Sequence, residues 1–182
     1  MTREKALELL KANLKNKNLQ KHCLAVEAGM RHFARYFGED EELWGLAGLL
    51  HDLDYEDTKN DFDRHGLQTA EMLEKIDGVD DRIIYAIKAH PGHVEPKSKM
   101  DKVLYALDPL TGLVIAATLM HPEKKISALD KDFLIRRFNE KRFAAGANRD
   151  QIRSCEDFDM ELEDFLDHTI KAMASIEKEL GF

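Results

Sequence analysis

Residues 43–52 read LWGLAGLLHD, an almost continuous apolar run that ends in a histidine and an aspartate. A segment of this kind is typical of a central helix that is buried on most sides. Burying an imidazole and a carboxylate at its end is unfavourable unless both groups gain a partner. A metal ion is the most economical partner for such a pair. We therefore expect a helical core with a metal site where this helix ends, at His51 and Asp52.

Apolar residues recur at intervals of three and four along most of the chain, which indicates further helices. Gly38, Gly78 and Pro91 stand where the pattern stops, as expected at helix ends. The acidic, aperiodic stretch 52–63 is expected to form a loop, and Pro109 should bend the helix that contains it. The predicted helices comprise residues 19–37, 41–50, 65–77, 80–90, 100–120, 129–143 and 160–180.

No strand pattern of comparable strength appears, so the sequence predicts an all-α fold, a single-domain helical bundle over residues 1–182. The chemistry-bearing residues lie in a core of about residues 18–120, and the helices within 129–180 are expected to pack on this core. No internal repeat or Pro/Gly-rich linker divides the chain.

The composition is that of a soluble globular protein, with 34% charged and 43% hydrophobic residues in 182. Because no cationic, apolar segment of the secretory kind stands at the N-terminus, we expect a cytoplasmic protein. The apolar stretch 109–120 is too short to cross a bilayer, so no membrane role is expected. Cys23 and Cys155 show no paired spacing and are expected to be packing thiols.

The formal net charge of -8 argues against stable binding to nucleic-acid backbone, which needs clustered lysine and arginine. A small phosphorylated substrate is still compatible with this charge, because a bound divalent ion reverses the local field. We therefore expect a small-molecule partner. The sequence predicts no oligomeric state.

Four further residues on the predicted helices offer metal-ligating side chains. His22 falls on the buried stripe of the 19–37 helix, His65 at a helix start, His90 at a helix end and Asp108 within the long 100–120 helix. Helix ends and buried faces can converge on one place. Imidazole suits Fe, Mn, Co, Ni and Zn, and mixed nitrogen and oxygen ligation suits a catalytic site. We expect a first ion to be held by His22, His51, Asp52 and Asp108, and a second by His65 and His90, with Asp52 as the bridge.

This ordered set resembles the signature of the HD superfamily of metal-dependent phosphohydrolases, a helical histidine followed by His-Asp and a distant aspartate. The resemblance covers about residues 18–120, and His65 and His90 are similar to the two additional histidines of its dinuclear branch. It implies an all-α domain that binds one or two transition-metal or magnesium ions and hydrolyses phosphate esters, commonly of nucleotides. Many members also carry a lysine shortly after the His-Asp pair, but residues 53–56 here read LDYE.

Several residues are weaker candidates for the site. Asp54 and Glu56 are candidates for proton transfer in an acidic loop that would cover the metal ions. His93 is either a substrate contact or a solvated loop histidine. Arg142 and Arg149 could reach a substrate phosphate, because guanidinium matches its geometry, although each is also compatible with a surface ion pair.

The expected activity is metal-dependent hydrolysis of a phosphate ester or anhydride in a small, nucleotide-like metabolite. The alternative has the same six ligands: they are also similar to those of HD-type mixed-valent di-iron oxygenases, which cleave C–C or C–P bonds. Ligand identity does not separate these two activities. A non-catalytic binding module is disfavoured because no ligand is missing.

Overall fold

Helices α2 (Lys17–Phe37) and α3 (Glu41–Leu50) lie at the centre of the fold and pack on each other more extensively than any other pair. The structure, a computed structural model, describes residues 1–182. Helix α2 ends at the predicted residue, Phe37, and α3 has the predicted bounds. Gly38 closes α2 in the left-handed conformation at φ 72°, which glycine adopts without strain, and the Asp40 side chain caps α3 by accepting from the Leu43 N–H.

Glycines allow α2 and α3 to approach each other closely. A Cβ atom added to Gly48 would lie 3.0 Å from the Cα atom of Glu27 and 2.9 Å from Cγ of Met30, and one added to Gly45 would lie 2.6 Å from Nε of Arg31. A larger residue at position 48 would therefore push the two helices apart, because it would meet backbone atoms of α2, whereas one at position 45 would displace the Arg31 side chain. This close approach places the N-terminal part of α2 beside the C-terminal end of α3.

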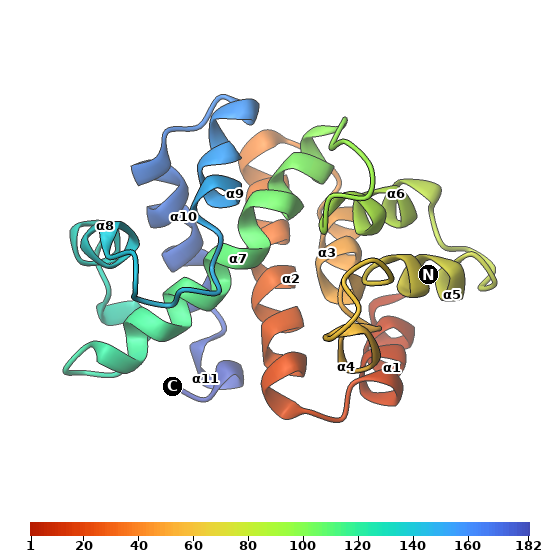
Figure 1. The fold of residues 1–182 in the computed structure, drawn as a ribbon, viewed down its shortest axis with the longest axis horizontal. Helices are drawn as coiled ribbons and strands as arrows, with labels where there is room; N and C mark the ends of the chain where they lie inside the picture. Colours follow the sequence, from red (N-terminus) through yellow and green to blue (C-terminus); the bar gives the residue numbers. More distant parts are fainter.

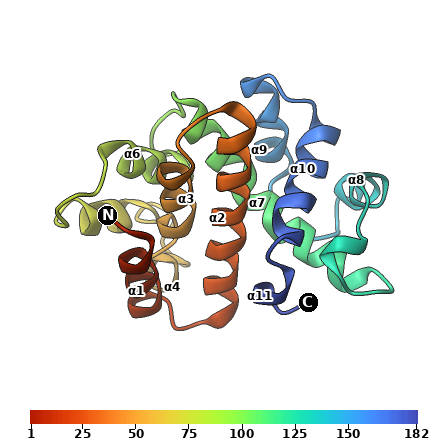
Figure 2. The ribbon, with the colours of Figure 1, turned by 180° about the vertical axis from the view of Figure 1, so that it is seen from behind.

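Helix α7 (Lys99–Met120) crosses the molecule next to α2 and divides it into two sides (Figures 1 and 2). On one side lie the remaining N-terminal helices: α1 (Arg3–Asn13), α4 (Tyr55–Thr58), α5 (Leu67–Leu73) and α6 (Asp81–Ala89). On the other side lie α8 (Lys131–Asn139), α9 (Arg149–Arg153), α10 (Leu162–Ala174) and α11 (Glu177–Leu180), with 3₁₀ turns at Ile126–Ala128 and Ser154–Phe158.

All regular elements are helices, so the predicted all-α fold is confirmed. One hydrophobic cluster runs from Ala6 to Leu180, and within it α10 packs against both α2 and α7. Cys23 and Cys155 are buried free thiols in this cluster. Helix α7 is long and apolar enough to cross a membrane, but 56% of its most apolar window is buried inside the protein, as in a core helix.

Several segments differ from the prediction, including the helix expected over 65–77, which as α5 comprises only Leu67–Leu73. The helix expected over 129–143 ends at Asn139 and is followed by a loop to Asn148. The helix expected over 160–180 begins at Leu162 and is interrupted at Ser175 and Ile176, so that α10 and α11 are separate. The predicted loop 52–63 contains the short helix α4. Helix α1, which the apolar pattern did not reveal, packs on α3.

Candidate metal centre

The first group of ligating atoms brings together three helices. His22 comes from α2, His51 directly follows α3, and Asp108 lies within α7. Nε2 of His22 lies 3.2 Å from Nε2 of His51 and 3.0 Å from Oδ1 of Asp108. Nε2 of His51 is 3.7 Å from the same Asp108 oxygen. Three side chains far apart in the sequence therefore present their donor atoms to one point.

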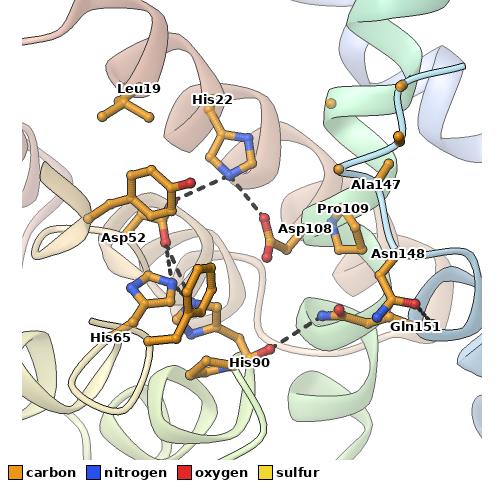
Figure 3. A pocket seen from close by; sticks show the side chains of 17 residues that line it. Leu19, His22, Asp52, His65, His90, Asp108, Pro109, Ala147, Asn148 and Gln151 are labelled. Carbon is orange, nitrogen blue, oxygen red and sulfur yellow. Dashed lines mark hydrogen bonds and ion pairs between the residues drawn. The ribbon is translucent and has the colours of Figure 1, made fainter. Parts of the chain in front are cut away.

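The second group lies beside the first and shares Asp52 with it. Nε2 of His65 lies 3.1 Å from Nε2 of His90, and both lie close to Oδ1 of Asp52, at 3.3 and 3.5 Å. The same oxygen is 3.4 Å from Nε2 of His51, while Oδ2 is 3.6 Å from Nε2 of His22. Figure 3 shows His22, Asp52, His65, His90 and Asp108 directed into one space. The Asp52 carboxylate therefore lies between the two groups, as a bridging ligand would.

These separations fit donor atoms that share metal ions. Two ligand atoms at about 2.1 Å from one ion are about 3.0 Å apart at a right angle and about 3.4 Å apart at the tetrahedral angle. The donor atoms here are 3.0 to 3.7 Å apart. His22, His51 and Asp108 form one set able to hold an ion, and His51, Asp52 and His90 form another. The side chains present fit one or two divalent ions.

The opposite nitrogen of each histidine is fixed by a hydrogen bond. Nδ1 of His51 donates to the Gly48 carbonyl at 2.8 Å, and Nδ1 of His90 donates to the Ile87 carbonyl at 2.6 Å. Nδ1 of His65 lies 2.9 Å from the Asp54 carboxylate, and Nδ1 of His22 lies 3.1 Å from the Thr111 hydroxyl. Partners of this kind hold the imidazole rings with their Nε2 atoms directed at a metal ion.

The protein's own charges set the protonation of the site. Burial alone lowers the pKa of His51, but the carboxylates of Asp52 and Asp108 raise it to about 9. Burial also opposes protonation of His65, whose pKa is nevertheless raised to about 10 by its hydrogen bonds to Asp52 and Asp54. Burial lowers the pKa of His90. Metal binding near neutral pH must therefore displace protons from His51 and His65.

Asp54 and Glu56 do not occupy the positions that proton transfer to a substrate requires. Asp54 is buried, and its carboxylate accepts hydrogen bonds from His65 Nδ1 and from the Thr69 N–H, each at 2.9 Å. It therefore orients His65. Glu56 accepts from the backbone N–H groups of Lys15 and Asn16, at 3.0 and 2.5 Å, and so stabilises the start of α2. Both predicted proton-transfer roles are corrected by these contacts.

The three predicted substrate contacts also lie outside the cavity. Nε2 of His93 donates to the backbone carbonyl of His65 at 2.8 Å, on an exposed loop. Arg142 is exposed and makes no hydrogen bond or ion pair. Arg149 directs its guanidinium at backbone carbonyls of its own loop instead of at the cavity. None of the three side chains lines the cavity that opens over the metal ligands.

A cavity of about 660 Å³ opens over the metal ligands. Tyr55 and Phe62 form an aromatic part of its wall, and Phe62 is 64% exposed at its rim. Burial raises the pKa of the Tyr55 phenol, and the negative charges of Asp52 and Asp108 raise it further. No lysine or arginine lines the cavity. The sequence did not indicate that Tyr55 and Phe62 line the cavity, because aromatic residues occur in cores as well as in binding sites. Tyr55 follows the His-Asp pair by only three residues.

The opposite wall comes from the C-terminal side of the molecule, where Asn148 and Gln151 lie beyond Asp108 in Figure 3. Gln151 donates from Nε2 to the carbonyls of Tyr105 and His90, at 2.7 and 3.3 Å. The Tyr105 carbonyl is free to accept because Pro109, four residues later, has no N–H to donate. The proline therefore provides an attachment point for α9 beside the metal centre.

Comparisons with known proteins agree with this geometry. The family model described as "HD domain" matches residues 19–128, more than half of the chain and including all six candidate ligands. Ribonuclease Y of Desulfotalea psychrophila (strain LSv54 / DSM 12343) is 33% identical over 95 residues, which cover 52% of this chain and 18% of that protein. The similarity thus spans less than a fifth of this relative. No solved structure matches significantly. The chain belongs to the HD domain family.

Proposed function

We propose that this protein is a metal-dependent hydrolase of phosphate esters or anhydrides in a small, nucleotide-like metabolite. The observation that carries the proposal is the Asp52 carboxylate, which lies between two groups of converging histidine nitrogens. Membership of the HD domain family supports the coarser part of it, a metal-dependent hydrolase. Two ions that share one carboxylate are a common arrangement for phosphoryl chemistry.

In this proposal each side chain has a defined task. His22, His51, Asp52 and Asp108 would hold one ion, and His65 and His90 would hold a second together with Asp52. Divalent ions at these positions would supply acidification of a water molecule and polarisation of the phosphoryl oxygens. Asp54, Thr111 and the Gly48 and Ile87 carbonyls keep the imidazole rings in place. The ions would be of Fe, Mn, Co, Ni or Zn, or Mg.

The cavity favours a small substrate over a polymer. Its volume of about 660 Å³ is in the range of small-molecule sites. The relative's name, Ribonuclease Y, indicates that RNA is its substrate. RNA binding depends on lysine and arginine contacts to phosphates, but this cavity has neither and the chain has a net charge of -8. We propose a small phosphorylated substrate, no stable nucleic-acid partner and a cytoplasmic location without membrane attachment.

The proposal is tested by metal analysis of the purified protein together with a screen for phosphate release from nucleotides and other small phosphate esters. We expect one or two equivalents of a divalent metal and phosphate release that chelation abolishes. The same ligand set also suits a mixed-valent di-iron oxygenase. Stoichiometric iron with a mixed-valent electron paramagnetic resonance signal, and no phosphate release from any ester, would replace the hydrolase by the oxygenase.

A further inference from the structure

Arg149 binds the backbone of the loop that precedes it. Its guanidinium donates to the carbonyls of Phe143, Ala147 and Ala144 at 2.5, 2.6 and 2.8 Å, and to those of Phe138 and Glu140 at 3.1 and 3.5 Å. No carboxylate lies within 4.0 Å of it, so no acidic side chain neutralises its charge. The positive charge is instead surrounded by the negative ends of peptide dipoles.

This arrangement fixes the direction of the loop's N–H groups. In a trans peptide the C=O and N–H bonds point in opposite directions, and the chain has no cis peptide. Because the carbonyls of Phe143, Ala144 and Ala147 point to Arg149, the N–H groups of Ala144, Ala145 and Asn148 point away from it. None of these three N–H groups has a hydrogen-bond partner within the protein.

The residues that carry these N–H groups line the cavity over the metal centre. The cavity wall includes Ala144, Ala145, Gly146, Ala147 and Asn148, whose small side chains leave the backbone accessible. Ala144 has a φ of 43°, a left-handed conformation that is unfavourable for alanine and persists because neighbouring contacts impose it. Successive N–H groups around a left-handed residue form a concave site of the kind that binds anions.

We propose that residues 144–148 form a main-chain binding site for an oxyanion of the substrate, with Arg149 as the positioning residue that shapes it. The inference rests on the proposed function, because it assigns the loop to a phosphorylated substrate bound in the same cavity. It also explains how a cavity without lysine or arginine accommodates such a substrate. The charge of Arg149 acts through the peptide dipoles, whose positive ends face the cavity.

The first test removes one N–H group while preserving the backbone geometry. Asn148 has a φ of -66°, the value that proline requires, so Asn148→Pro deletes its N–H without strain at this angle. Asn148→Ala is the matched control, because both variants lose the side chain that caps α9 and only the proline variant loses the N–H. Inorganic phosphate and azide serve as probes, titrated calorimetrically into the manganese-loaded proteins; azide can bind the ions without reaching the loop.

We expect Asn148→Pro to bind phosphate roughly ten- to hundredfold more weakly than Asn148→Ala, with azide affinity and metal content equal in the two. Equal phosphate affinities in the two variants would overturn the proposal. So would a parallel loss of phosphate and azide binding, because the loop would then only support the metal centre. Phosphate binding with this pattern, in a protein that hydrolyses no ester, would refute the proposed function and leave the anion site standing.

A second pair of variants tests the positioning role and remains informative if the proline variant misfolds. Arg149→Lys keeps the charge but offers a single ammonium in place of the planar guanidinium that reaches five carbonyls. Arg142→Lys makes the same change at an exposed position of the same loop. We expect Arg149→Lys to weaken phosphate binding at least about tenfold with unchanged azide binding. Identical phosphate affinities in the two lysine variants would contradict the role assigned to Arg149.

Discussion

The two walls of the cavity are built by different means. The wall between His22 and Asp108 consists of ionisable side chains on or next to helices, and a second hydrogen bond holds each of its histidine rings. The wall at residues 144–148 presents backbone N–H groups of a loop, whose shape depends on one arginine behind it. A side chain's chemistry is visible in its residue type. The chemistry of a backbone wall depends on peptide orientation, which residue types do not reveal.

The largest expected effect lies on the side-chain wall, where Asp52 serves both groups of ligands. Asp52→Ala should abolish metal retention and activity, because its carboxylate lies within 3.6 Å of all four histidine nitrogens. Metal content by mass spectrometry and turnover are the measurements. Glu56→Ala is the control: it removes a carboxylate four residues away that contacts only Lys15 and Asn16, and should leave both quantities unchanged. Full metal content in Asp52→Ala would refute the bridging assignment.

A smaller loss of metal is expected from two other variants on the same wall, which show whether the site holds one ion or two. His65→Ala and His90→Ala each remove one of the two histidines that hold the second ion with Asp52. We expect about one ion instead of about two, with the helical fold intact and turnover strongly reduced, because a clamp on both reacting oxygens needs both ions. Metal stoichiometry, circular dichroism and turnover measure these three quantities. Metal content and turnover equal to those of the unmodified protein in both variants would contradict the assignment of a second ion to His65 and His90.

The same contrast between side chains and backbone explains which parts were predictable from the sequence. The end of α2 was predicted because Gly38 acts locally, and the ligand set was predicted because each donor is a side chain with a known chemistry. The end of α8 at Asn139 was not predicted, because the apolar pattern continues to Phe143. In the structure Arg149 binds carbonyls between residues 138 and 147, which holds this segment in a non-helical arrangement. The sequence left Arg149 as either a contact to a substrate phosphate or a surface ion-pair residue, and the structure shows neither, because a guanidinium's binding partner depends on tertiary contacts.

The next prediction tests whether Asp54 supports the ligand His65 as Arg149 is proposed to support the 144–148 loop. Asp54→Asn keeps the shape of the side chain but removes the negative charge that Nδ1 of His65 contacts at 2.9 Å. We expect metal affinity to fall by about ten- to hundredfold, the usual cost of losing such a partner, without the complete loss expected for Asp52→Ala. Competition with a chromogenic chelator measures the affinity. Asp57→Asn, on the exposed side of α4, is the control, and equal affinities in both variants would show that Asp54 does not support His65.

The smallest expected effect combines a gain in stability with a loss in substrate binding. Gly112 lies inside α7 and lines the cavity, and a Cβ atom added there would meet nothing within 4 Å. Neither packing nor a positive φ requires glycine at this position. Gly112→Ala should therefore stabilise the fold by about 0.5 to 1 kcal/mol, because glycine inside a helix costs about this much relative to alanine.

The added methyl group would take up space in the cavity that Gly112 lines, so we expect KM to rise roughly two- to tenfold with kcat little changed. Thermal unfolding and steady-state kinetics measure the two effects. Ala116→Gly, one turn further along α7 and outside the cavity wall, is the opposite control: it should lower stability by a similar amount and leave KM unchanged. A stabilised Gly112→Ala protein with unchanged KM would show that the substrate does not contact the part of the cavity that Gly112 lines.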